Sequence, residues 1–186
     1  MQSTQVLMDE HRTIERVLSA LQVAAERVSQ GEAMQPAFFL KAAFFIKNFA
    51  DGSHHKKEEG ILFIAMQEAG IPVQGGPIGV MLAEHEQGRV FTQTMKDAAN
   101  KLESGDLSAR AVVVQNALDY VALLRQHISK ENNILFPMAD RVIQSGRQEK
   151  IVADFKQIDL DETGQDIHKK YLEIAENLET ESQGKI

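Results

Sequence analysis

The segment HHKKEEGILF at residues 54–63 aligns without a gap with the segment HISKENNILF at residues 127–136. The two segments share a histidine at the first position, a lysine at the fourth, a glutamate at the fifth and Ile-Leu-Phe at the end. On an α-helix, side chains four residues apart lie on the same face. Each segment therefore predicts a helix that presents a histidine and a glutamate, one turn apart, on one face.

The residues that follow indicate that both of these faces point inward. Leu62 and Leu135 extend the two stripes by a further four residues. An ionisable side chain on a buried face is costly unless it is paired or binds a metal. Helical bundles hold pairs of metal ions with carboxylates and imidazoles that project into the core in this way. We interpret the repeat as part of a metal site.

Two further histidines extend the pattern to four helices. His11 shares a helical face with Ile14 and Leu18, and His85 lies between two glutamates. Either histidine alone would most simply be a hydrogen-bonded residue of the core. Together with the repeat, they give each of four helices one histidine near an apolar stripe. Four imidazoles and two carboxylates suit ions such as iron, manganese or zinc.

The spacing of apolar residues is helical along almost the whole chain. We expect main helices over residues 3–29, 37–68, 78–102 and 108–142, and shorter ones over 149–157 and 165–178. Ser108 is the expected N-cap of the fourth helix, and Pro137 is expected to kink that helix or end it early. The predicted fold is all-α: an antiparallel up-down four-helix bundle over residues 1–145, with a C-terminal helical extension over residues 146–186 packed on it.

Composition and charge argue against several other classes of function. The 186 residues carry a formal net charge of −7 and no basic block, which argues against a nucleic-acid-binding protein. The chain has no cysteine, so disulfides, thiolate ligands and thiol nucleophiles are excluded. The first residues lack the pattern of a signal peptide, and no stretch approaches a membrane span. We expect a cytoplasmic protein that contacts neither nucleic acid nor membrane.

Taken together in this order, the motifs resemble those of the hemerythrin-like, or HHE cation-binding, family. They are Asp9-Glu10-His11, His54-x-x-x-Glu58, Glu84-His85-Glu86 and His127-x-x-x-Glu131 followed by Leu135-Phe136-Pro137. The resemblance covers about residues 1–145 and implies a four-helix bundle with a non-haem centre of two iron ions, oxo- or hydroxo-bridged. It implies one metal held by His11 and His54, a second held by His85 and His127, and bridges from Glu58 and Glu131.

The chain departs from the oxygen-carrying members of that family at several positions. Met81 stands where those proteins have a second histidine, and Asn132 stands where they have an aspartate. Ile64 stands where the second repeat has Pro137, which should alter a helix kink rather than the chemistry. The sequence therefore resembles a bacterial branch with His–Glu motifs, and simple oxygen storage is not the expected role.

The choice of the His–Glu pair in the second helix stays open at the level of sequence. His55 and Glu59 form a rival His-x-x-x-Glu pair, but the gapless repeat favours His54 and Glu58. His55 and Glu59 are then expected to support the ligands from behind or to lie on the surface.

The C-terminal extension offers a further candidate ligand. His168 and Tyr171 lie three residues apart in the last helix. If this helix covers the open end of the bundle, His168 replaces the imidazole missing at Met81, and Tyr171 lines the pocket. The bland alternative is an exposed histidine beside a half-buried tyrosine.

Three functions fit the sequence. The first is a di-iron protein that binds or reacts with dioxygen, peroxide or nitric oxide, with an enzymatic turnover of peroxide or nitric oxide left open. The second is a non-catalytic sensor or store for iron or oxygen. The third is a structural bundle with a vestigial or zinc-filled site. Manganese or zinc can replace iron in such a donor set, and a homo-oligomer is compatible with all three.

Overall fold

The computed structural model describes residues 2–160 and 164–184. Apart from one isolated bridge between Leu160 and Asp166, every regular element in these ranges is a helix, which confirms the all-α class. The elements are α1 (Gln2–Ser29), α2 (Pro36–Phe45), η1 (Ile46–His55), η2 (Glu58–Leu62), α3 (Phe63–Glu68), α4 (Pro77–Glu103), η3 (Leu107–Ala109), α5 (Arg110–Lys130), η4 (Glu131–Leu135), α6 (Phe136–Val142), η5 (Ser145–Arg147), α7 (Gln148–Ile158) and α8 (His168–Ser182).

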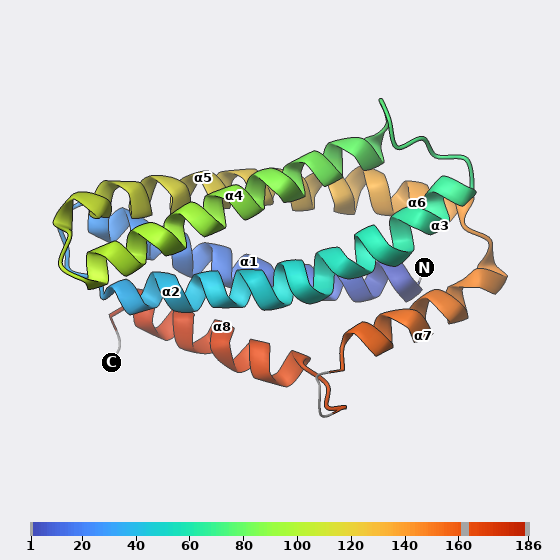
Figure 1. The fold of residues 1–186 in the computed structure, drawn as a ribbon. Helices are drawn as coiled ribbons and strands as arrows, with labels where there is room; N and C mark the ends of the chain where they lie inside the picture. The colour runs from blue at the N-terminus through green and yellow to red at the C-terminus, as the bar shows by residue number, and fades with distance from the viewer. Residues whose placement is uncertain (1, 161–163, 185–186) are drawn as a thin grey trace.

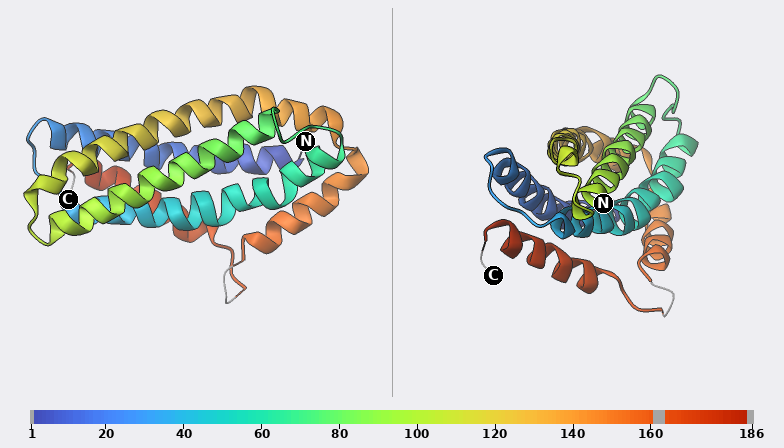
Figure 2. Two further views of the ribbon diagram at one scale, coloured as in Figure 1. Left: turned by 45° about the horizontal axis from the view of Figure 1, so that its top comes forward. Right: turned by 60° about the vertical axis from the view of Figure 1, so that its left-hand side comes forward.

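Four long helical arms lie side by side (Figures 1 and 2). The first arm is α1, and the second runs from α2 through η1 and η2 into α3. The third arm is α4, and the fourth runs from α5 through η4 into α6. The two C-terminal helices lie outside these arms: α7 contacts α1 and η2, and α8 contacts α1 and α2. Each arm supplies one side of a shared interior.

The apolar interior is divided into two clusters, and the predicted site residues lie between them. On α1, Leu7 belongs to one cluster and Ile14 to the other, with His11 between them. On α4, Met81 and Met95 belong to different clusters in the same way, with His85 between them. The polar site is therefore enclosed by hydrophobic packing at both ends.

The second and fourth arms are not uniform α-helices. They contain three π-helical segments, η1, η2 and η4, in which backbone hydrogen bonds join residues i and i+5. The sequence predicted one helix over residues 37–68, and the structure is helical over this range, with π-helical turns in place of regular α-helix in parts of it. Segments of this kind are rare and occur often at functional sites. Here they contain His54, His55, Glu58 and Glu131, so the irregular backbone coincides with the predicted ligands.

A close approach of two helices sits one turn beyond His85. A Cβ atom added at Gly88 would lie 3.4 Å from both the Tyr120 ring and Leu124. The absence of a side chain at Gly88 therefore lets α4 and α5 pack closely beside the site.

The structure corrects the expected N-cap of the fourth arm and excludes one of the two effects expected of Pro137. Ser108 is not the cap, because the N-cap residue of α5 is Ala109, and the preceding turn η3 is capped by Asp106, whose carboxylate accepts a hydrogen bond from the Ser108 amide at 3.0 Å. Pro137 does not end the arm, because it occupies the first turn of α6, where a missing amide hydrogen costs little. The irregular turn lies just before it, in η4.

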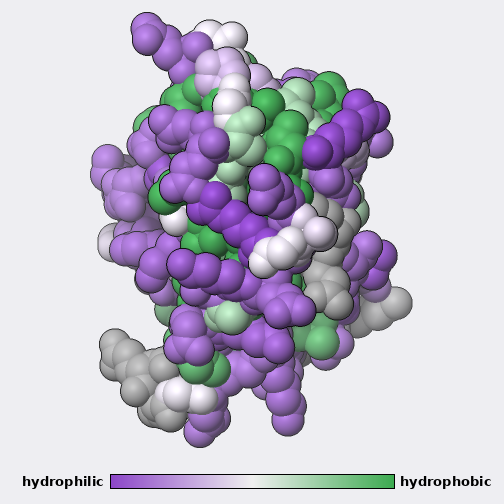
Figure 3. Space-filling model, turned by 90° about the vertical axis from the view of Figure 1, so that its right-hand side faces the viewer, coloured by the Kyte–Doolittle hydropathy of each residue, from purple (hydrophilic) through white to green (hydrophobic). Residues whose placement is uncertain are grey.

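One helical run among the described residues, Leu107–Val142, is long and apolar enough by length and composition to cross a membrane. The core helix of a soluble protein passes the same test, so this is weak evidence for a span. The run carries His127 and Glu131, both of which are buried in the bundle. On the face shown in Figure 3, hydrophilic residues surround smaller hydrophobic areas.

The core predicts a clear difference between two phenylalanines on α2. Phe39 is fully buried, whereas Phe44 is 46% exposed. Substituting Phe39→Ala should lower the free energy of unfolding by about 3–5 kcal/mol, because it removes buried apolar surface and leaves a cavity. Phe44→Ala, the matched control, should cost well under half as much. Denaturant unfolding at equal metal content measures both, and equal losses would contradict this account of the core.

Candidate metal centre

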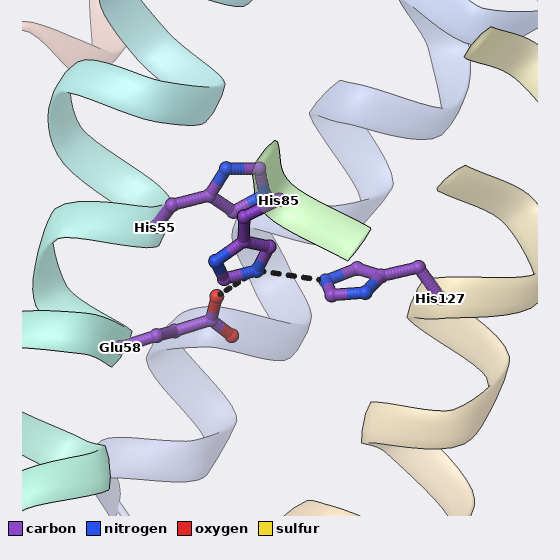
Figure 4. Close-up of side chains that lie close together, drawn as sticks. All are labelled: His55, Glu58, His85 and His127. Atoms are coloured by element: carbon purple, nitrogen blue, oxygen red, sulfur yellow. Dashed lines mark hydrogen bonds and ion pairs between the residues drawn. The ribbon is translucent and has the colours of Figure 1, made fainter. Parts of the chain in front are cut away.

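Five buried histidines and two buried glutamates from all four arms converge in the interior. They form two groups whose potential ligand atoms all lie within 4.8 Å of one another inside each group. The first group contains His11, His54, Glu58 and Glu131. The second group contains His55, Glu58, His85 and His127, and its side chains point toward one another in Figure 4.

Each of the five histidines is fixed through its Nδ1 atom. In every case the partner is a carboxylate or amide oxygen, which can only accept, so Nδ1 carries the proton and donates. This leaves Nε2 with its lone pair directed into the site, as expected for a metal-binding imidazole. The acceptors are Asn132 for His11 (2.8 Å), Glu10 for His54 (2.9 Å), Asp51 for His55 (2.9 Å), Glu59 for His85 (2.7 Å) and Glu84 for His127 (3.0 Å).

The two central carboxylates each face both groups. One oxygen of Glu131 lies 3.2 Å from His11 Nε2, and the other lies 3.1 Å from His127 Nε2. Glu58 does the same with His54 and His85, at 3.5 Å from each Nε2 atom. Each carboxylate therefore offers one oxygen to either group, which is the arrangement that bridging between two ions requires.

Several of these atoms have no hydrogen-bond partner within the described part of the chain. Both oxygens of Glu58, both oxygens of Glu131 and the Nε2 atoms of His11 and His54 are buried and unpartnered. Buried groups of this kind are rare in native proteins because each costs the full loss of its hydration. A bound cation would satisfy all of them, so the donor set fits divalent metal ions.

The contact between His85 and His127 points the same way. Their Nε2 atoms lie 3.0 Å apart (Figure 4). Because both rings donate through Nδ1, the two Nε2 atoms present lone pairs to each other. Such an approach is repulsive unless a cation or an added proton lies beside both nitrogens.

The electrostatics of the site favour the neutral form of three imidazoles and shift the pKa values of the two carboxylates in opposite directions. Burial lowers the pKa of His54 to about 4 and lowers the pKa values of His55 and His85 as well. Burial, with the negative charge of Glu131, raises the pKa of Glu58 well above its usual range. Burial also acts to raise the pKa of Glu131, but His127 and His11 outweigh it and hold that pKa well below its usual range.

The structure brings together the six residues that the repeat and the lone histidines indicated, and it adds His55. His55 stacks on His85 with ring centroids 3.8 Å apart. Neighbouring residues of a regular α-helix point in different directions, which is why the sequence pairing left His55 behind the ligands. The π-helical turn of η1 changes the register and lets His54 and His55 face different groups. The sequence signals for His55 were its adjacency to His54 and its spacing from Glu59.

Glu59 lies behind the second group, as one of the sequence alternatives proposed. Its carboxylate holds His85 and also pairs with Arg89 Nη2 at 2.6 Å. Arg89 Nε lies 3.5 Å from Asp51, the residue that holds His55. Burial raises the pKa of Asp51 to about 6, although Arg89 opposes the shift. One guanidinium thus touches the carboxylates behind two of the histidines.

A third cluster of ionisable groups ties the C-terminal extension to the first group. Lys57 is fully buried, and its ammonium pairs with both Glu10 and Asp159. Glu10 is the residue that holds His54, and Asp159 also accepts a hydrogen bond from Ser53 at 2.9 Å. Buried charges are tolerated when they are paired in this way.

The structure does not bring His168 to either group. Its Nε2 atom lies 2.9 Å from Glu10, and its Nδ1 atom lies 2.7 Å from Asp166. His168 therefore contacts His54 only through Glu10, and the third imidazole of the second group is that of His55. Tyr171 packs against Phe45 and Phe49, with ring centroids 5.9 and 5.3 Å away.

An all-helical protein with convergent buried histidines and glutamates is of the cation-binding class. A family model described as the hemerythrin HHE cation binding domain matches residues 2–139. The chain belongs to this family.

Curated relatives resemble parts of the chain. An uncharacterized protein of Mycobacterium tuberculosis is 27% identical over 132 residues, which are 70% of this chain and 51% of that protein. The iron-sulfur cluster repair protein YtfE of Escherichia coli is 33% identical over 89 residues, which are 47% of this chain and 40% of YtfE. The chain thus spans about half the length of the first relative and less than half the length of the second. No solved structure gives a significant match.

The buried lysine yields a prediction about stability. Substituting Lys57→Met should lower the free energy of unfolding by about 3–5 kcal/mol, because it removes the buried ammonium that pairs with the carboxylates of both Glu10 and Asp159. Denaturant unfolding measures the change. Lys56→Met is the matched control, since Lys56 is the exposed neighbour and should tolerate the substitution. A wild-type-like Lys57→Met protein would refute the role given to this ammonium.

The contact between His168 and Glu10 yields a prediction about pH. The hydrogen bond to Glu10 raises the pKa of His168 to about 9 in the folded protein, against about 6.5 in an unfolded chain. A raised pKa stabilises the fold fully below pH ~6.5, and the contribution is lost as the pH rises through about 9. The stability difference between wild type and His168→Gln should therefore shrink across this interval. Denaturant unfolding at a series of pH values tests it, and a constant difference would count against the contact.

Proposed function

We propose that the protein is a non-haem di-metal protein, with iron as the resident ion, that binds or reacts with dioxygen, peroxide or nitric oxide. The observation that supports this most strongly is the fixing of five buried imidazoles by their Nδ1 atoms. Four of them, His11, His54, His85 and His127, place Nε2 within 3.5 Å of two carboxylates that lack any other partner among the described residues. A histidine that is simply hydrogen-bonded in a protein core does not require unpartnered carboxylates beside its second nitrogen.

The donor atoms suggest which residues would hold each ion. His11 and His54 would hold one ion, and His55, His85 and His127 would hold the other, with Glu58 and Glu131 shared between them. Imidazole nitrogens and carboxylate oxygens are ligands that iron, manganese and zinc all accept. The proposal assigns His168 no direct contact with a metal.

The bound pair of ions would supply the redox and Lewis-acid chemistry. The protein's own part is to hold the imidazoles in one tautomer and one orientation, which the acceptors behind Nδ1 accomplish. Phe136 stacks on His11 at 5.5 Å, and Phe63 lies 6.2 Å from His85. These aromatic walls limit water and favour a small, weakly polar ligand over a large charged one.

The two histidine groups contain unequal numbers of imidazoles, which supports different roles for the two ions. The group of His11 and His54 has one imidazole fewer than the group of His55, His85 and His127. An added ligand would find more room on the side with fewer protein donors. Behind that side, Glu10 connects His54 to the partly exposed His168, so hydrogen-bonded groups reach from the site toward solvent. These hydrogen-bonded side chains can hold or pass a proton when the ligand's charge changes.

A second candidate function is iron handling without turnover. YtfE, to which part of this chain is similar, is named as an iron-sulfur cluster repair protein. The shared segment favours iron as the metal and is compatible with a store or sensor that gains or releases iron. A structural bundle with a zinc-filled site is the third reading, and the same experiments separate all three.

The wider setting is also part of the proposal. The four arms would form an antiparallel up-down bundle with the C-terminal extension packed on it, as the sequence predicted. We propose a cytoplasmic location and no contact with nucleic acid or membrane, and a homo-oligomer is compatible with the site.

Metal analysis with matched variants tests the proposal. The protein purified in air should contain about two irons per chain, and its visible absorption should change when peroxide is added. His11→Ala should lose most of one ion, because it removes one of only two imidazoles on that side. Glu58→Ala should reduce both ions, because both groups share this carboxylate. Glu86→Gln, on the exposed side of α4 beside His85, is the control and should retain both.

The outcomes separate the candidate functions. Two irons with peroxide turnover that is absent from the metal-free protein support the reactive-ligand function. Two irons without turnover favour the store or sensor. A single zinc, or metal content that is unchanged by Glu58→Ala, would overturn the di-metal proposal.

A further inference from the structure

A cleft separate from the metal centre lies between η1 and α4, on the outer side of the bundle. Its volume is about 330 Å³, which is at the lower end of the range for small-molecule sites. Lys47, Asp51 and Gly52 line it from η1, and Arg89, Thr92 and Lys96 line it from α4. The cleft is large enough for a molecule of about ten heavy atoms.

The charge of this cleft is opposite to that of the whole chain. Lys47, Arg89 and Lys96 bring three cations to the lining, against the single carboxylate of Asp51. Within residues 2–160 and 164–184, Lys47 and Lys96 form no ion pair. The chain as a whole carries a formal charge of −7. A local excess of cations in an acidic protein, with two of them free of partners, favours an anionic ligand.

A buried hydroxyl group in the lining independently indicates a ligand. Thr92 is only 6% exposed, and its Oγ1 atom has no hydrogen-bond partner in the described part of the chain. A buried hydroxyl without a partner has lost its hydrogen bonds to water and has gained none in the protein. The Oγ1 atom itself is covered, so a rotation of the side chain about its Cα–Cβ bond would bring the hydroxyl to the cleft, where an oxyanion would accept its hydrogen bond. Thr92 and the two lysines would then act on the same negatively charged group.

The cleft is also adjacent to the residues behind the second histidine group. Arg89 lines the cleft and pairs with both Asp51 and Glu59. These are the carboxylates that hold His55 and His85. An anion that draws the guanidinium toward the cleft would weaken its hold on both carboxylates.

We propose that this cleft binds a small organic oxyanion, a carboxylate or a phosphate monoester, and that its binding is sensed by the His55–His85 side of the metal centre. Lys47 and Lys96 supply the attraction, and Thr92 supplies a directional hydrogen bond. Ala43, Gly52 and the aliphatic stems of the lysines leave space for an apolar body. The coupling to the metal centre rests on the function proposed above, whereas the binding itself does not.

Isothermal titration calorimetry with benzoate and phenyl phosphate tests the binding, with acetate and inorganic phosphate as the small counterparts. At least one of the two aromatic anions should bind more tightly than its small counterpart, and the preferred one assigns carboxylate or phosphate chemistry to the site. The double variant Lys47→Ala/Lys96→Ala should weaken binding tenfold or more. Thr92→Val, which keeps the shape and removes the hydroxyl, should weaken it about fivefold, or about 1 kcal/mol.

Lys101→Ala is the matched control, because Lys101 is an exposed lysine on the same helix that does not line the cleft. It should bind the probes like the wild type. No measurable heat with any probe at millimolar concentration would overturn the proposal. Equal weakening by Lys101→Ala would overturn it too, since binding would then reflect general surface charge.

The visible spectrum of the metal-loaded protein tests the coupling. Saturation with the tighter probe should shift the absorption in wild type and leave it unchanged in the double lysine variant. A probe that binds in the calorimeter without moving the spectrum overturns the coupling and leaves the cleft as a binding site. Calorimetry needs neither metal nor turnover, so failure of the di-metal function is distinguishable from failure of the cleft.

Discussion

The central constraint on this molecule is the cost of placing two carboxylates and five imidazoles in the middle of a helical bundle. Glu58 and Glu131 are completely buried, and no described residue donates a hydrogen bond to them. The surrounding structure is arranged around that cost. Oxygen acceptors fix the outer nitrogen of every imidazole, hydrophobic clusters close both ends, and π-helical turns adjust the direction of the side chains. The same cost makes the site a strong attractor for cations.

Much of this could be predicted from the sequence because it follows from helical periodicity. The all-α class and the positions of His11, His54, His85 and His127 follow from the spacing of residues along an α-helix. The role of His55 could not be predicted in this way, because it depends on a local change of helical register. Nothing in the apolar pattern marks that change. The place of His168 was equally hidden, since it depends on how the last helix packs and on the charge of Glu10.

Asp159 illustrates a further limit of sequence reasoning. It follows α7 in a short connection with no recognisable motif, yet it meets the buried Lys57 from far away in the chain. A single buried cation between two distant acids is a property of the tertiary structure, and no local pattern carries it. The asymmetry of the two histidine groups is of the same kind, because three imidazoles meet on one side only after the arms have packed.

The contacts of the C-terminal extension affect which part of this chain could be transferred to another protein by itself. The family model matches residues 2–139, whereas Asp159 and His168 lie beyond that boundary and both act on groups within it. Some buried ionisable groups of the matched segment are therefore paired with residues outside it. A recombination event that carried only the recognised segment into another protein would remove one of the two carboxylates that pair with the buried ammonium of Lys57. In this lineage, Lys57 and the extension are expected to be gained, kept or lost together.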